Sequence, residues 1–238
     1  MTGEGQIMGE RTPVTGSTMK TRMLHAMLPA GLGEEPVRWQ QQKSARTRLR
    51  LVEAAIDCLV EGGYAGLTTQ AVAERTGASR GSMHHHFPTR MDLVEAVVEH
   101  VFYQRMRLFL DDYLSNLARS SEAEMLEIAS AAHWRSVHSR EYSAYLELAV
   151  AARTDTELDQ FFGPVARRYD DVWIAEMIES FPQWRDQWEQ MKLASDLVST
   201  VHMGMLLQHP VYGDARTERI HNLTNEVLRL IYANKVGV

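Results

Sequence analysis

Residues 68–90 read TTQAVAERTGASRGSMHHHFPTR, and this stretch decides the fold. Either threonine at its start can cap a short helix, which Gly77 then ends. Ser79 can cap a second short helix, which ends before Pro88. Two short helices joined by a turn at a glycine are typical of a helix-turn-helix.

The second short helix can be oriented from its sequence, because successive residues of an α-helix point about 100° apart. Met83 is its large apolar side chain and should face the core, with His86 beside it and half buried. The opposite side is polar, short in reach and free of carboxylates, as a surface that enters the major groove of DNA should be. That side carries Arg80, Gly81, Ser82, His84 and His85.

The rest of the chain shows helical periodicity and no strand alternation, so the fold class is all-α. Three helices are expected within residues 43–90, which form the helix-turn-helix domain. A second helical domain is expected over residues 91–238. Its helices are predicted over residues 89–117, 122–137, 141–152, 156–180, 184–207 and 215–234.

Residues 1–42 are rich in Gly, Thr, Glu and Pro and show no sustained periodicity, which predicts a disordered arm. The arm has no apolar segment of the kind that a secretory signal requires. It also contains five methionines, so the true translation start within residues 1–42 is left open.

The formal net charge of −6 argues at first against a partner as acidic as DNA. Its division along the chain reverses that argument. Residues 43–90 carry seven basic and four acidic side chains, whereas residues 91–238 carry 14 and 23. The one cysteine excludes an internal disulfide framework, and no apolar run approaches the roughly 20 residues that span a bilayer. These features favour a cytoplasmic protein with no membrane partner.

Residues 46–93 resemble the DNA-binding domain of the TetR family of bacterial transcriptional regulators. The shared pattern includes Gly63-Tyr64, Ala73, Phe87 and a basic residue at position 90, followed by Leu93. Family members commonly carry Tyr-His-Tyr-Phe where this chain has three histidines before Phe87. The resemblance implies a homodimer that binds double-stranded DNA at a palindromic operator. It also implies a repressor that a small apolar or amphipathic effector releases.

The resemblance extends the set of residues expected to contact DNA. Thr69 should meet a phosphate at the start of its helix, and Lys43 and Arg46 should meet phosphates from the first helix. Arg80 is the candidate for a guanine contact. His84 and Arg90 are expected to reach phosphates. The complete predicted DNA-binding set is Lys43, Arg46, Thr69, Ser79, Arg80, Gly81, Ser82, His84, His85 and Arg90.

The second domain is expected to supply an effector pocket and a dimer interface. Aromatic, methionine and polar side chains of its middle helices could line the pocket: Met125, His133, Trp134, Tyr145, Phe162, Arg168, Tyr169 and Trp173. The last two helices have apolar faces that could form a four-helix bundle with a second copy. The interface residues expected there are Leu197, Val201, Gly204, Met205, Leu223, Val227, Leu230 and Ile231.

Three other interpretations compete with this one. The protein could be an activator, or a constitutive DNA-binding protein without a small ligand. A helical-bundle enzyme is a remote alternative, because the chain has no G-x-S-x-G, H-E-x-x-H or phosphate-binding loop. The three adjacent histidines cannot all ligate one ion from one helix, so no metal and no cofactor is predicted. The operator, the effector and the regulated genes are not encoded in any recognisable pattern.

Overall fold

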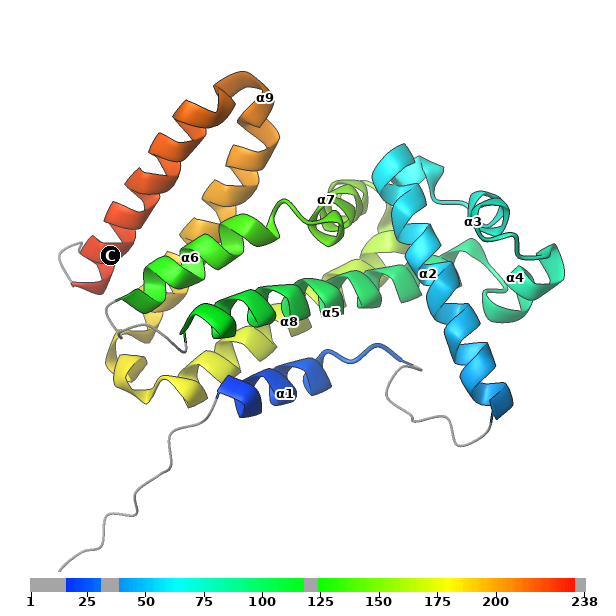
Figure 1. Cartoon of the computed structure of the whole chain (residues 1–238), viewed down its shortest axis with the longest axis horizontal. Coiled ribbons are helices and arrows are strands. Elements are labelled where there is room, and N and C mark those ends of the chain that lie inside the picture. Colours follow the sequence, from blue (N-terminus) through cyan, green and yellow to red (C-terminus); the bar gives the residue numbers. More distant parts are fainter. Residues whose placement is uncertain (1–15, 31–38, 118–123, 234–238) are drawn as a thin grey trace, which may run out of the picture.

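The computed structural model describes residues 16–30, 39–117 and 124–233, and every regular element in these ranges is helical. A small unit of three helices lies at one end of the molecule, and longer helices form the body (Figure 1). The predicted all-α class is therefore confirmed. The helices are α1 Gly16–Ala26, α2 Trp39–Gly66, α3 Thr69–Thr76, α4 Arg80–His86, α5 Arg90–Leu117, α6 Met125–Ser136, α7 Arg140–Ala152, α8 Thr156–Ser180, the 3-10 helix η2 Pro182–Gln187, and α9 Trp188–Tyr232.

Side-chain and glycine caps set the limits of α3 and α4. Thr68 Oγ accepts a hydrogen bond from the backbone N–H of Ala71 at 3.1 Å and caps α3. Gly77 ends α3 in the left-handed conformation, at φ 66° and ψ 18°, which a glycine adopts without steric cost. Ser79 Oγ then accepts from the N–H of Ser82 at 3.1 Å and starts α4. The helix-turn-helix predicted from residues 68–90 is confirmed.

The central element of the body is α5. It packs against α1, α2, α6, α7 and α8, and so joins the small unit to the body. Its buried face includes Val97, Val101 and Leu110, which lie in one core cluster with residues of α2 and α7. None of the helices within the described ranges is long and apolar enough to cross a membrane.

The last element, α9, is a helical hairpin (Figure 1). Its chain reverses at Gly213, where φ is 66° and ψ is 173°, a conformation that L side chains rarely adopt. The limbs 188–212 and 214–232 pack through a small cluster of Ala194, Val198, Leu228 and Ile231. The sequence predicted two helices here, and the structure joins them through this tight turn.

The N-terminal segment corrects one prediction. Residues 16–26 form the helix α1 and residues 39–42 begin α2, so the expectation of a disordered arm over residues 1–42 is wrong in both places; residues 1–15 and 31–38 lie outside the described residues. Met19, Met23 and Met27 are buried in the main core, with α1 packed on α5 and α8. Their spacing of four residues is that of one helix face, and this signal was missed because the flanking composition is polar.

Candidate nucleic-acid interface and ligand cavity

Helix α4 presents its polar side to solvent, as the sequence predicted. The Met83 side chain is 3% exposed and lies in the main core. Arg80, His84 and His85 are exposed, whereas His86 is half-buried. Burial lowers the pKa of His86, and the neighbouring His85 and Arg48 lower it further. The exposed side of α4 therefore carries a cation and imidazoles without a carboxylate.

The exposed cations near α4 are free to meet an anion. Arg80 and Arg46 form no ion pair within the described ranges, and both are exposed. Lys43 is also exposed and lies with its Nζ 5.6 Å from the centre of the Trp39 ring. These side chains come from the first turns of α2 and from α4, which belong to the same small unit (Figure 1).

Arg48 holds the C-terminal end of α4 in place, a function that the sequence did not reveal. Its Nη1 donates to the carbonyl of His86 at 3.2 Å, and its guanidinium lies 4.4 Å from the centre of the Phe87 ring. A cation at a helix C-terminus satisfies an otherwise unpaired carbonyl. Arg48 therefore positions α4 on α2.

Arg90 makes contacts within the protein that the sequence did not reveal, and its predicted phosphate contact stays a prediction. Its Nε donates to the carbonyl of Leu67 at 2.7 Å, and its Nη2 donates to the carbonyl of Tyr64 at 2.8 Å. Its guanidinium also lies 4.4 Å from the centre of the Tyr64 ring. These contacts tie the start of α5 to the loop before α3. The side chain is thus engaged inside the protein.

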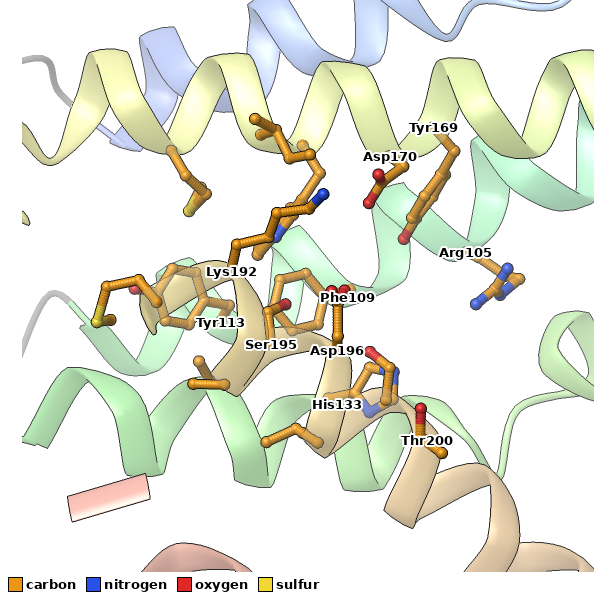
Figure 2. A pocket seen from close by; sticks show the side chains of 18 of the residues that line it. Arg105, Phe109, Tyr113, His133, Tyr169, Asp170, Lys192, Ser195, Asp196 and Thr200 are labelled. Carbon is orange, nitrogen blue, oxygen red and sulfur yellow. The ribbon is translucent and has the colours of Figure 1, made fainter. Parts of the chain in front are cut away.

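The body encloses a cavity of about 380 Å³ between α5, α6, α7, α8 and α9 (Figure 2). Four of the predicted pocket residues line it: His133, Tyr145, Tyr169 and Trp173. The sequence missed the contribution of α5, which supplies Arg105, Phe109 and Tyr113. The apolar residues of α5 indicated a core helix. Only the packed bundle shows which residues of α5 line the cavity.

The other four predicted pocket residues do not line the cavity. Met125 is buried in the main core, and Trp134 packs on the rings of His138, His202 and His221. The Phe162 ring packs against Phe102, with the ring centres 5.4 Å apart. Nε and Nη2 of Arg168 are buried with no hydrogen-bond partner among the described residues. These residues belong to the wall behind the lining or to other parts of the core.

Three histidines form a hydrogen-bonded chain that begins at the cavity. The Nδ1 atoms of His133 and His202 are 3.0 Å apart, and His202 Nε2 is 3.1 Å from His221 Nδ1. Burial lowers the pKa of His133 to about 4 and that of His202 to about 3. The chain therefore joins α6 to both limbs of α9 in an uncharged state at neutral pH. The described residues contain no group of three or more His, Cys, Asp or Glu side chains placed to hold a metal ion.

The hairpin α9 exposes only part of the predicted dimer interface. Leu223 is 64% exposed and Leu230 is 44% exposed, which is unusual for large apolar side chains. Met205 and Ile231 are only 2% and 5% exposed in the single chain, and their contact with a second copy stays a prediction. They point inward because the two limbs of α9 pack on each other and on the body. Leu197, Val201, Gly204 and Val227 are half-buried.

An ionic cluster joins the small unit to the body. Arg140, at the start of α7, contacts Glu53 and Asp57 of α2. His100 of α5 is buried, and its Nε2 lies 2.8 Å from Glu53 Oε1. Arg75 of α3 extends the cluster, with its Nε 3.6 Å from Asp57 Oδ2. Helices that line the cavity and helices of the small unit thus share charged side chains.

Comparison with known proteins shows a family pattern at the small unit. Residues 51–97 match the family described as bacterial regulatory proteins, tetR family. These residues run from α2 through the helix-turn-helix into α5.

The similarity extends into the body. The HTH-type transcriptional regulator CymR of Pseudomonas putida is 28% identical over 209 residues, which cover 82% of this chain and 96% of CymR. The HTH-type transcriptional regulator Rv2912c of Mycobacterium tuberculosis is 31% identical over 152 residues, covering 61% of this chain and 76% of that protein. The solved structure of the multidrug binding protein EbrR complexed with imidazole superposes with a TM-score of 0.55 at 18% identity, over 75% of this chain and 93% of EbrR.

Proposed function

This chain belongs to the tetR family of bacterial regulatory proteins, and we propose that it represses transcription from a palindromic operator until a small molecule enters its cavity. Regulators of this family bind DNA and are not enzymes. The observation that carries the proposal is the exposed, carboxylate-free side of α4, together with exposed cations of α2 that form no ion pair among the described residues. Residues 43–90 are the proposed DNA-binding domain, and residues 91–238 the proposed effector and dimerisation domain.

Apart from Arg90, the residues of the predicted DNA-binding set divide into two proposed kinds of DNA contact. Arg80 and His85, with Ser82, read base edges in the major groove, and Gly81 lets the backbone approach closely. The other members of the set contact phosphates, which position the protein without reading sequence. That group contains Lys43, Arg46, Thr69, Ser79 and His84.

Selection of bound sequences from random DNA tests the division. Arg80→Ala should relax the preference at one or two base pairs, because a bidentate arginine–guanine contact discriminates by roughly 1–3 kcal/mol. Arg46→Ala should weaken binding to all sequences alike and lower the salt slope by about one. Arg219→Ala, at an exposed arginine of α9, is the matched control. Equal losses on every sequence for all three variants would refute the proposed interface.

The cavity is the proposed effector site, and its position supports this. A volume of about 380 Å³ with mostly apolar walls and a few polar groups suits a small ligand. The ligand would act by binding better to a conformation in which the two DNA-binding units no longer match their half-sites. We place the protein in the cytoplasm, where its operator lies.

The proposed homodimer uses the exposed side of the α9 hairpin. Leu207, Val211, Leu223 and Leu230 are large exposed apolar residues of that hairpin. Two hairpins packed face to face would make a four-helix bundle and place two heads on half-sites about one helical turn apart or a multiple of it. Light scattering should give twice the chain mass, and Leu223→Glu should give a monomer. A wild-type monomer at micromolar concentration would exclude this arrangement.

A further inference from the structure

Arg105 is a cation of the cavity that is surrounded by aromatic rings. The Arg105 guanidinium lies 3.7 Å from the centre of the Tyr145 ring and 4.8 Å from that of Tyr142. The rings of Tyr169 and Phe102 follow at 5.4 and 5.5 Å. Arg105 forms no ion pair within the described residues, and it is half-buried.

Several other arginines of the molecule have carboxylate partners. Arg22 contacts Glu176, Arg75 contacts Glu61, Arg135 contacts Asp112, and Arg140 contacts Asp57. Removing a charge from water costs free energy unless an opposite charge or several hydrogen bonds replace the water. Ring faces attract a cation, but they offer only part of that replacement. The donors of Arg105 therefore remain available to an incoming anion.

The charged groups are separated within the cavity. Arg105 lies at one end of the view with Tyr169, whereas Lys192 and Tyr113 lie toward the other end (Figure 2). Asp170 and Asp196 also line the cavity as exposed residues, and among the described residues neither forms an ion pair with Arg105. His133 is neutral at neutral pH because burial, and then the charge of Arg105, lower its pKa to about 4. The Arg105 end thus holds a permanent cation among neutral rings.

Much of the remaining lining is apolar and aromatic. Phe109, Trp173, Met177, Trp184 and Met191 are the large apolar and aromatic side chains of this part of the lining. A ligand that used the whole space would place an acidic group at the arginine and an apolar body against these side chains. Planar guanidinium groups bind carboxylate-like anions through two parallel hydrogen bonds, which would fix the orientation of such a ligand.

We propose that the cavity binds an amphipathic organic acid, with its anionic group on Arg105 and its apolar body along Phe109, Trp173 and Met177. The inference rests on the proposed function, because it assigns a ligand class to the proposed effector site. A neutral or cationic ligand of the same shape would leave the guanidinium without an anionic partner. The acid should therefore bind more tightly than its uncharged counterpart.

Two fluorescent probes with one ring skeleton test this. The first is 1-anilinonaphthalene-8-sulfonate, an anion; the second is N-phenyl-1-naphthylamine, which lacks the sulfonate. Energy transfer from the cavity tryptophans reports binding. Wild type should bind the anion at least tenfold more tightly than the amine. Arg105→Met should weaken binding of the anion about tenfold and leave that of the amine within twofold. Arg107→Met, at an exposed arginine on the same helix, should resemble wild type.

Several outcomes would overturn the anion site. They are no anion binding by wild type, equal binding of the two probes, and an Arg105→Met variant with unchanged affinity for the anion. If Arg105→Met fails to fold, as judged by circular dichroism, Arg105→Gln carries the same test. DNA affinity without probe is measured in parallel on every variant. If wild type binds DNA and Arg105→Met does not change the affinity for the anionic probe, only the proposed anion site is contradicted. If wild type does not bind DNA, the proposed function is contradicted, and the probe affinities still test the anion site.

Discussion

Arg140 Nη1 lies 2.7 Å from Asp57 Oδ1, and this ion pair joins the start of α7 to the middle of α2. Helix α7 supplies Tyr142 and Tyr145 to the cavity, and α2 carries the small unit. Asp57 is shared with Arg75 of α3. A ligand that moves α7 would therefore move Arg140, whose partner Asp57 also contacts Arg75 of the helix-turn-helix.

Replacement of Arg140 by methionine should loosen this junction. The pair is about one-third exposed, so we expect a loss of only about 1–2 kcal/mol in the free energy of unfolding by urea. Hydrogen exchange should rise in the middle of α2 and the first turn of α7. Arg153→Met, at the exposed far end of α7, is the control. Equal exchange in the two variants would show that Arg140 does not hold the junction.

Glu53 should make the protein sensitive to acid. A hydrogen bond from His100 and then one from Arg140 lower its pKa from 4.5 to about 2, against the opposing effect of burial. The stabilisation is fully present above pH 4.5 and is lost as the pH falls toward 2, because the folded state binds that proton less readily than the unfolded state. Glu53→Gln should reduce the dependence of the free energy of unfolding on pH between about 2 and 4.5, whereas Glu95→Gln, at an exposed position, should leave that dependence unchanged. The same slope in both variants would assign the effect to other groups.

Arg90 should matter more for stability than for direct DNA contact. Its two hydrogen bonds to carbonyls and its position over Tyr64 predict a loss of about 2–4 kcal/mol for Arg90→Ala. Arg80→Ala, on an exposed side chain, should change the free energy of unfolding by less than about 0.5 kcal/mol. Urea unfolding measures both. A stable Arg90→Ala variant with weakened DNA binding would instead restore the phosphate contact expected from the sequence.

Helix α1 should contribute to the stability of the body. The Met23 side chain is fully buried, so Met23→Ala should cost about 2–5 kcal/mol through lost apolar contact and the resulting cavity. His25→Ala, on the exposed side of the same helix, should be nearly neutral. Thermal unfolding of the two variants distinguishes a packed helix from an arm without contacts. Equal melting temperatures would argue against the packing of α1.

The sequence alone determined the features that depend on neighbouring residues. Thr68, Gly77 and Ser79 act through their own caps and turn, within four residues of the groups that they bond. The orientation of α4 followed from Met83 for the same reason, since the 100° step between successive residues fixes where its neighbours point once Met83 faces the core. Local hydrogen bonding and helical periodicity are readable without knowledge of the partner helices.

Only the tertiary structure decided which distant side chains meet. Arg90 turns inward because the carbonyls of Tyr64 and Leu67 lie beside it, more than 20 residues earlier in the chain. Met205 and Ile231 are buried because α9 folds back on itself at Gly213. Arg105 became the centre of a candidate anion site because α5, α7 and α8 bring rings around it, while no carboxylate of the described residues forms an ion pair with it. An apolar or charged residue in a helical pattern indicates a face, and the packing of the helices decides what that face meets.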